Sequence, residues 1–183
     1  MPVQLRAVTP PEIPDLWPQI RDRIASCCER SGGKYAPADV LRNLIASAMN
    51  LWIALDEDNA IKALLITEIA AYPRITVCRL LACTGDDAAL WVDLLAPIEG
   101  WAKSQGCAAM EPICRPGWER RLKPMGYRKT QTRPDVPDVD CGSLMVAVAV
   151  TSSWASYGLR NVRQSVFGAP WPNRQRSLSC PWL

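Results

Sequence analysis

The stretch that decides the fold is Ile75–Ala82, which reads ITVCRLLA. Its residues are apolar on both faces, which is typical of a strand buried in the middle of a sheet. Helices must therefore cover both sides of that sheet. A helix is predicted directly after the strand, because apolar residues recur there at the helical period. These residues are Leu90, Trp91, Leu94, Leu95, Ile98, Trp101 and Ala102.

Three further features complete the pattern around this helix. Thr84 has the chemistry of an N-cap that opens it, and Pro97 predicts a bend inside it. Gly106 predicts its end, after which Cys107–Cys114 has the pattern of another strand. A short helix over residues 117–125 and a last strand opening at Gly126-Tyr127 follow.

The chain before residue 75 predicts one strand and two helices. Val3–Val8 alternates weakly as a strand, and Thr9-Pro10-Pro11-Glu12 has the spacing of a capping box that opens a helix ending at Gly32-Gly33. The apolar positions of this helix are Leu16, Ile20, Ile24 and Cys27. Pro37 starts a second helix over Ala38–Met49. Its apolar face consists of Val40, Leu41, Leu44, Ile45 and Ala48.

Two apolar segments, Leu51–Leu55 and Ile61–Ala71, flank a polar turn over residues 56–59, as in an antiparallel hairpin. The predicted order is therefore β, α, α, β, β, β, α, β, α, β. An antiparallel run of strands followed by a late β-α-β unit indicates an α+β fold. We expect a mixed, mainly antiparallel central sheet flanked by helices on both faces.

Composition excludes several classes of function. The 183 residues predict one domain, and 49% apolar residues permit a packed core. The chain has no histidine, which excludes a Ser-His-Asp triad, a Cys-His dyad and any His-ligated metal. A net charge of +3, without a run of basic residues, argues against a nucleic-acid partner. The longest apolar runs are far too short to span a membrane.

The start of the chain lacks the apolar stretch of a secretory signal, so we expect a reducing cytoplasm in which the eight cysteines are thiols. No Cys-x-x-Cys pair is present, which argues against a zinc site, and no metal is predicted. Cys78, Cys107 and Cys114 lie in apolar runs and are interpreted as small buried hydrophobes.

A change in composition near residue 133 predicts two regions. Residues 1–133 hold all five lysines and all seven glutamates, and residues 134–183 hold neither. One interpretation is that this atypical tail, partly extended or disordered, arose from an altered reading frame or a terminal fusion. The alternative is that Ser143–Val150 supplies a final strand and the remainder is an arm. Exposed Trp154, Trp171 and Trp182 would then contact a partner.

Several motifs carry a resemblance to a known family. They are Leu94-Leu95, Ile98-Glu99, Trp101-Ala102-Lys103 and Gly106-Cys107, then Arg115-Pro116-Gly117-Trp118, Leu122 and Gly126-Tyr127. With the element order, over roughly residues 3 to 130, they resemble the GNAT family of N-acetyltransferases. In particular, the chain is similar to GNAT-like proteins of bacteriophages and prophages. The resemblance implies transfer of an acyl group from acyl-CoA to a small-molecule or protein amine.

The resemblance also implies where acetyl-CoA binds. Backbone amides at the end of a strand and the start of the next helix hold the pyrophosphate in this family. The corresponding residues are Leu81, Ala82, Cys83, Gly85, Asp86 and Asp87. In the register counted back from Leu94-Leu95, two aspartates replace a cation and Trp91 replaces a very small residue. Charge and bulk therefore oppose binding, although a shift of a few residues would make Gly85 the loop glycine.

Acetyl transfer to an amine requires a base. A primary amine has a pKa near 10.4, so roughly one molecule in a thousand or fewer is neutral at pH 7. Glu68 and Glu111 are candidate bases if they face the cleft; solvated or edge positions are the alternative. The family's usual acid is a tyrosine, and this chain has Leu122 at that position. Tyr127 is therefore the candidate acid, with a packing role in the core as the alternative.

Two functions follow from these observations. The first is a GNAT-like N-acetyltransferase with a degenerate cofactor loop, in the cytoplasm of a bacterial host. The second is a non-catalytic protein on the same scaffold, associated with a virion and bound to a phage structural protein.

Overall fold

The computed structural model describes residues 3–31, 33–85, 88–114, 118–131 and 146–149. The strands are β1 (Gln4–Val8), β2 (Asn50–Leu55), β3 (Ile61–Ala71), β4 (Thr76–Gly85), β5 (Ala109–Cys114), β6 (Arg128–Gln131) and β7 (Val146–Ala149). The helices are η1 (Pro10–Glu12), α1 (Ile13–Glu29), α2 (Pro37–Ile45), α3 (Ala88–Ser104), α4 (Glu119–Leu122) and η3 (Lys123–Met125). Among the described residues, no helix is both long and apolar enough to cross a membrane.

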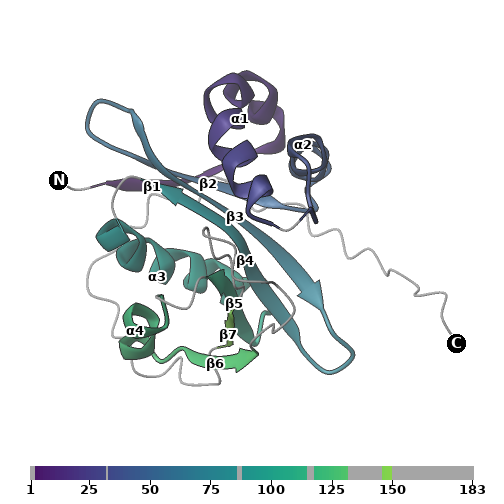
Figure 1. The fold of residues 1–183 in the computed structure, drawn as a ribbon, viewed down its shortest axis with the longest axis vertical. Helices are drawn as coiled ribbons and strands as arrows, with labels where there is room; N and C mark the ends of the chain where they lie inside the picture. The colour runs from purple at the N-terminus through teal and green to yellow at the C-terminus, as the bar shows by residue number, and fades with distance from the viewer. Residues whose placement is uncertain (1–2, 32, 86–87, 115–117, 132–145, 150–183) are drawn as a thin grey trace, which may run out of the picture.

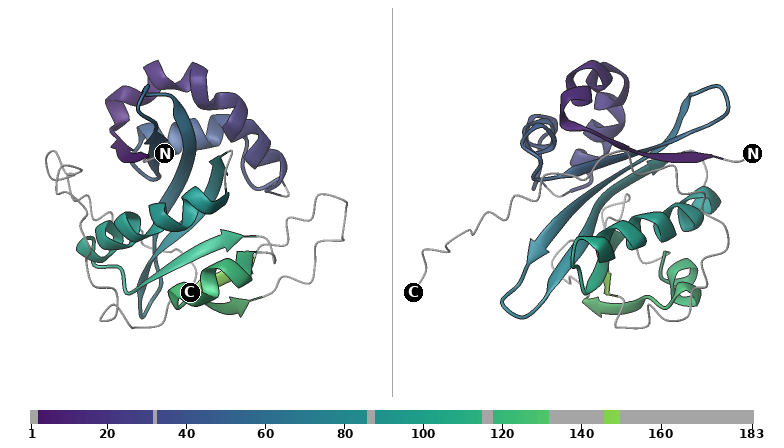
Figure 2. Two further views of the ribbon diagram at one scale, coloured as in Figure 1. Left: turned by 90° about the vertical axis from the view of Figure 1, so that its left-hand side faces the viewer. Right: turned by 180° about the vertical axis from the view of Figure 1, so that it is seen from behind.

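The strands form one sheet in the order β1-β2-β3-β4-β5-β7-β6. Neighbouring strands are antiparallel except β4 and β5, which run parallel because α3 connects them. Helices α1 and α2 cover one face of the sheet, and α3 with α4 covers the other (Figure 1; Figure 2). The predicted α+β fold, with a mainly antiparallel sheet between helices, is confirmed.

The first helical layer follows the prediction with two differences. The capping box forms, since Thr9 N donates to Glu12 Oε2 at 2.7 Å. Cys28 is buried in α1 rather than Cys27, which is only half-buried. The second helix ends at Ile45 and not at Met49, because Ser47 adopts a left-handed conformation with φ 58° that no helix continues through. Ile45 is consequently exposed instead of buried.

The apolar side chains below α1 and α2 form one cluster, which we call the α1/α2 cluster. Helix side chains interlock here with the face of β2 and β3 that points toward α1. Its buried members are Val8, Ile13, Ile20, Ile24, Cys28, Val40, Leu44, Met49, Leu51, Ile53, Leu64 and Ile66.

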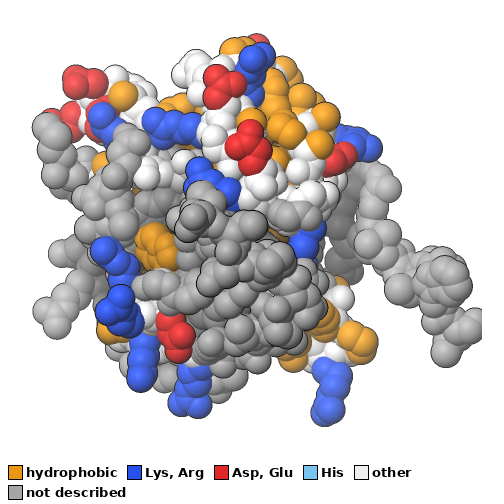
Figure 3. Space-filling model, in the orientation of Figure 1, with side chains coloured by type: hydrophobic (Ala, Val, Ile, Leu, Met, Phe, Trp, Pro, Cys, Tyr) orange, Lys and Arg blue, Asp and Glu red, His pale blue; other side chains and the backbone are white. Residues whose placement is uncertain are grey.

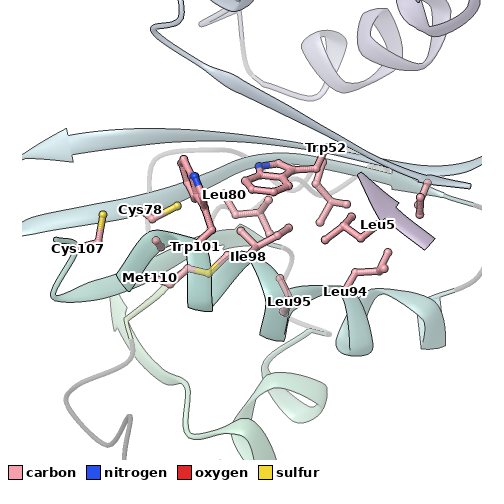
Figure 4. Packing of buried hydrophobic residues seen from close by; sticks show 14 of the residues in the cluster. Leu5, Trp52, Cys78, Leu80, Leu94, Leu95, Ile98, Trp101, Cys107 and Met110 are labelled. Atoms are coloured by element: carbon pink, nitrogen blue, oxygen red, sulfur yellow. The ribbon is translucent and has the colours of Figure 1, made fainter. Parts of the chain in front are cut away.

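A second cluster, the α3 cluster, fills the opposite side of the sheet (Figure 4). Trp52 and Trp101 meet edge to face with ring centroids 5.0 Å apart, and Trp52 Nε1 donates to the buried Thr67 Oγ1 at 3.0 Å. The predicted apolar stripe of α3 is buried at all its described side chains. These are Leu94, Leu95, Ile98, Trp101 and Ala102.

Around α3, one expectation about capping is wrong and one about cysteines is confirmed. Thr84 is not an N-cap, because β4 continues to Gly85 before α3 begins at Ala88. Cys78 and Cys107 are buried, and burial raises the pKa of Cys78 to about 12, so this thiol stays neutral. Only the backbone of Cys114 is described, in β5.

The C-terminal part of the described chain closes the sheet. Strand β7 lies between β5 and β6 and pairs antiparallel with both. It falls within Ser143–Val150, the range from which a final strand is expected. The boundary predicted at residue 133 stays a prediction, and Trp154, Trp171 and Trp182 lie outside the described residues.

A buried pair joins α3 to the region of β6. The hydroxyl of Tyr127 donates to Glu99 Oε1 and lies 3.6 Å from the Met110 sulfur. Burial raises the pKa of the Glu99 carboxyl, and the hydrogen bond from Tyr127 opposes this shift in part. The folded state therefore holds the Glu99 proton more tightly than the unfolded chain does.

Replacement of Ile24 by Ala is expected to lower the free energy of unfolding by about 2–5 kcal/mol, because a fully buried side chain leaves a cavity. Ile45→Ala, in the neighbouring helix and half exposed, is the matched control and should cost less than about 1 kcal/mol. Urea unfolding of both variants measures the difference. Equal losses would contradict the assigned burial.

The Glu99 carboxyl predicts a pH dependence of stability. Its raised folded-state pKa means that its contribution is present below the ordinary pKa of about 4.5 and is lost as pH rises through the folded value. Relative to Glu99→Gln, which does not titrate, the wild-type protein should therefore lose stability as pH increases over that window. Urea unfolding at several pH values, with Glu57→Gln as an exposed control, checks this. A difference that stays constant with pH would contradict it.

Candidate functional site

The candidate site lies where β4 and β5 stop pairing. Val77–Leu80 of β4 pairs in parallel with Ala109–Pro112 of β5. The next β5 residues, Ile113 and Cys114, pair with β7 instead, while β4 continues along β3 as far as Gly85. We call this point of divergence the β4–β5 split. Beyond Leu80, the last five residues of β4 are not paired with β5.

Pro112 marks the split. It is the last β5 residue in register with β4, opposite Leu80, and it has no backbone N–H. Strand β5 thus passes from pairing with β4 to pairing with β7 at a residue that cannot donate a backbone hydrogen bond to either neighbour.

On its other side, β4 carries a β-bulge beside the split. Ile66 of β3 is opposite Ala82 and Thr67 is opposite Leu80, which leaves Leu81 as an extra residue. Because of this extra residue, both Leu81 and Ala82 pack against the α1/α2 cluster. The bulge therefore changes which face each later β4 side chain occupies.

The structure brings four of the predicted cofactor residues together at the split. Leu81 and Ala82 form the bulge, Cys83 packs against the α3 cluster, and Gly85 ends β4. Asp86 and Asp87 lie outside the described residues, as does the side chain of Trp91. The altered phosphate loop therefore stays a prediction.

Both predicted base candidates belong to one row of charges. The register places Glu68 of β3, Arg79 of β4 and Glu111 of β5 side by side. Arg79 Nη1 donates to Glu68 Oε1 at 2.8 Å, and Arg79 Nε lies 3.9 Å from Glu111 Oε2. The two carboxylate side chains are only 20% and 19% exposed. We call these three residues the charged row.

The charged row faces α1 and α2. Cys78 and Leu80, the neighbours of Arg79, both point into the α3 cluster, so Arg79 points to the opposite side. Its Nε atom is buried and makes no hydrogen bond among the described residues. Glu111 directly precedes Pro112, so the row ends at the split. Both glutamates are partly buried, on one side of the sheet.

A small pocket lies between helices α1 and α2 and strands β3 and β4. It has a volume of about 30 Å³, which is room for about two water molecules. Its lining consists of Ile24, Cys27, Cys28, Ser31, Tyr35, Val40, Met49, Ile66, Leu81 and Ala82. Burial raises the pKa of Tyr35; the charge of Glu68 raises it further and that of Arg79 lowers it.

Tyr127 is not part of this arrangement. It is 3% exposed within the α3 cluster, on the opposite side of the sheet from the carboxylates. Leu122 is buried in the same cluster. The structure therefore supports the packing role of Tyr127 and places no tyrosine hydroxyl at position 122.

No cluster of three or more His, Cys, Asp or Glu side chains that could hold a metal ion occurs in the described part of the chain. Basic side chains instead gather at the end of the molecule that holds α4 and β6, at the lower edge of Figure 3. Arg120, Arg121, Lys123 and Arg128 are exposed there, and Arg121 lies over the Trp118 ring at 5.8 Å. These basic side chains are exposed to solvent and form a charged surface.

Sequence reasoning missed three residues of this site. Arg79 is a charged residue in a strand that is otherwise apolar on both faces, and that exception was the available signal. Pro112 within Cys107–Cys114 was a second signal, because proline ends strand pairing. Tyr35 had none, since it lies in the segment between α1 and α2 and lines the pocket only through packing.

Neither a family model nor a curated protein matches the sequence. Solved structures do match the fold. The PaiA N-acetyltransferase from Thermoplasma acidophilum, in complex with coenzyme A, has a TM-score of 0.55 at 14% identity over 83% of this chain and 100% of its own. An aminoglycoside acetyltransferase from an uncultured soil metagenomic sample has a TM-score of 0.56 at 11% identity, over 76% and 100%.

A third structure, histone acetyltransferase HPA2 and related acetyltransferase from Corynebacterium glutamicum, has a TM-score of 0.56 at 13% identity, over 86% of this chain and 100% of its own. Likeness at such low identity concerns the fold alone. The order of strands and helices, the parallel β4–β5 pair and these matches agree with one another. The chain has the fold of the GNAT acetyltransferases.

Proposed function

We propose that this protein is an N-acyltransferase that binds acyl-CoA at the β4–β5 split and transfers the acyl group to an amine at the charged row. The observation that carries the proposal is the coincidence of these two features. The β4–β5 pairing ends at Leu80 and Pro112, and Arg79 and Glu111 occupy the positions directly before. An extended ligand beside β4 would therefore end next to two carboxylates.

The residues present fit the pantetheine arm of such a ligand. Beyond Leu80 the backbone of β4 continues for five residues without a β5 register, and amide groups of an extended chain can pair with such an edge. When bound, acyl-CoA supplies a thioester: the amine nitrogen attacks the carbonyl carbon, a C–N bond forms, and the C–S bond breaks to release the thiolate. The bulge at Leu81 and Ala82 directly follows the last β4 residue that pairs with β5. The pantetheine arm would be held along β4 from this point.

The charged row supplies the proton acceptor for the amine. Glu68 already accepts a hydrogen bond from Arg79 at 2.8 Å, whereas Glu111 lies 3.9 Å from the same guanidinium and makes no hydrogen bond to it. The oxygens of Glu111 are therefore better placed to take a proton, and Arg79 positions both carboxylates. We assign Glu111 as the base and Glu68 as the residue that holds Arg79.

Loss of the leaving group relies on the thiolate itself. Leu122 is buried in the α3 cluster and cannot donate a proton, and Tyr127 lies in the same cluster, bonded to Glu99. A thiol has a pKa of about 8.5, so the thiolate is a tolerable leaving group near neutral pH and can be protonated by solvent afterwards. We expect transfer to be slow for this reason.

A non-catalytic role on the same fold is the second candidate, and the buried Leu122 is the observation that favours it. In this case the protein would be a binding component, for example bound to a phage structural protein. Acetyl-CoA binding without any transfer to amines would support this second candidate over the first.

Acetyl-CoA is expected to stabilise the protein by about 2.7 kcal/mol at 100 times its dissociation constant. Thermal shift titrations of the protein with acetyl-CoA measure this stabilisation. No stabilisation of the wild type at millimolar acetyl-CoA would exclude binding at the split.

Replacement of the base tests the chemistry. Glu111→Gln keeps the size of the side chain but cannot accept the amine proton, so turnover with a primary alkylamine should fall by about 10²–10⁴. Glu57→Gln, in the exposed turn between β2 and β3, should leave the rate unchanged. Release of free thiol from acetyl-CoA gives the rates. Wild-type turnover in Glu111→Gln would show that another group removes the proton.

A further inference from the structure

We propose that a second copy of this chain pairs with the free edge of β3, antiparallel and about a two-fold axis at Ala70. The inference goes beyond the proposed function, because it concerns assembly and requires neither acyl-CoA nor an amine. Three features of the structure carry it: an unpaired stretch of strand edge, exposed apolar side chains around that stretch, and a register in which the edge complements itself.

The free edge is the last part of β3. Thr67 is the last β3 residue in register with β2, whereas β3 continues along β4 as far as Ala71. In the turn that follows, Tyr72 N donates to Ile75 O at 2.8 Å, so the backbone groups of Tyr72 point toward β4. These groups alternate in direction along an antiparallel strand, so those of Ile69 and Ala71 point away from β4. Within the described ranges, the N–H and C=O groups of these two residues have no hydrogen-bond partner.

Exposed apolar side chains surround this edge. Among the described residues, the exposed large apolar side chains are Ile45, Ile69, Tyr72 and Ile75. The last three belong to the β3–β4 hairpin, which projects at the lower right of Figure 1 and the lower left of the right-hand view in Figure 2. Ile45 ends α2, shortly before β2 begins at Asn50 beside the edge. Apolar side chains gathered around an unpaired edge are typical of an interface.

The edge is complementary to itself. With a two-fold axis at Ala70, Ile69 of each copy lies opposite Ala71 of the other copy. The outward N–H and C=O groups of each such pair exchange two hydrogen bonds, as in any antiparallel ladder. Ala70 meets its own counterpart in a pair without hydrogen bonds, where the Cα atoms approach to about 4.5 Å and small side chains fit well.

The chain limits this register at both ends. On one side, Thr67 is already paired with β2. On the other side, Pro73 has no backbone N–H and lies in the turn. The stretch that can pair is therefore restricted to residues 68–72. A second hairpin of the same length satisfies this limit, which favours another copy of the chain over a longer foreign strand.

The same register places Tyr72 of one copy opposite Glu68 of the other. Both positions lie on the sheet face that Arg79 occupies, because side chains alternate along β3. Their backbone groups point toward β4, so the two residues form a close pair without hydrogen bonds between their backbones. A phenol hydroxyl can donate to a carboxylate. The second copy thus brings a tyrosine side chain next to the charged row.

The mass of the assembly is measured on the full chain by sedimentation velocity, without acetyl-CoA, over a range of concentrations. We expect a species of twice the mass of the chain. Ala71→Pro removes one outward N–H from each copy, and proline is tolerated where a strand N–H points to solvent. Ile69→Lys places a charge on the edge. Each variant should raise the dissociation constant of the dimer about tenfold or more.

Arg74→Ala is the matched control, because Arg74 is exposed in the same hairpin but lies outside the paired stretch. It should leave the dissociation constant unchanged. If Ala71→Pro does not fold, as judged by circular dichroism, Ile69→Lys decides the test, since its side chain is exposed in the single chain.

A cysteine at position 70 tests the register itself. In the two-fold pairing, two such residues face each other with Cα atoms in the range of about 4.4–6.8 Å that a disulfide spans. Mild oxidation of Ala70→Cys should therefore give a covalent dimer that a reducing agent separates. Glu57→Cys has the same number of cysteines, in the exposed turn between β2 and β3, and should give no more covalent dimer than the wild type.

A wild-type chain that stays monomeric at millimolar concentration overturns the inference. A dimer that tolerates both Ile69→Lys and Ala71→Pro, or in which Ala70→Cys forms no intermolecular disulfide, also overturns it, because the interface then lies elsewhere. None of these results depends on acetyl-CoA binding, so the outcome is separate from that of the proposed function.

Discussion

The divergence of β4 from β5 is the constraint on which the centre of this molecule depends. Strands β4 and β5 are parallel neighbours in the middle of the sheet, where the backbone groups of both strands need partners. Their register ends at Leu80 and Pro112, after which β5 pairs with β7 while β4 follows β3 to Gly85. The bulge at Leu81 increases the divergence, because a bulge bends its strand and adds local twist.

The two faces of the sheet have different tasks around this split. The α3 side is filled by large apolar side chains, with Trp52 against Trp101 and Tyr127 bonded to Glu99. The α1/α2 side carries the pocket and the charged row, whose partly buried charges lie next to the split. A separation of this kind lets a dense core stabilise a neighbouring site that has unfavourable charge burial of its own.

Local pattern was enough for most of the elements. Periods of two and 3.6 residues predict strands and helices because each element buries one face, and the capping box at Thr9 and Glu12 is a local contact. The errors occur where a non-local or conformational effect decides. Thr84 has the chemistry of an N-cap, but pairing with Leu64 keeps it in β4. Ile45 fits the helical stripe, but the left-handed Ser47 ends α2 beside it.

The sequence by itself determined the fold class, the absence of histidine chemistry and the two carboxylates worth considering as bases. Only the tertiary structure decided that Glu68 and Glu111 flank one arginine and that Tyr127 lies on the other side of the sheet. Glu68 and Glu111 are separated by more than a helix in the chain. Their alignment depends on the register of three strands, and packing of the whole sheet sets that register.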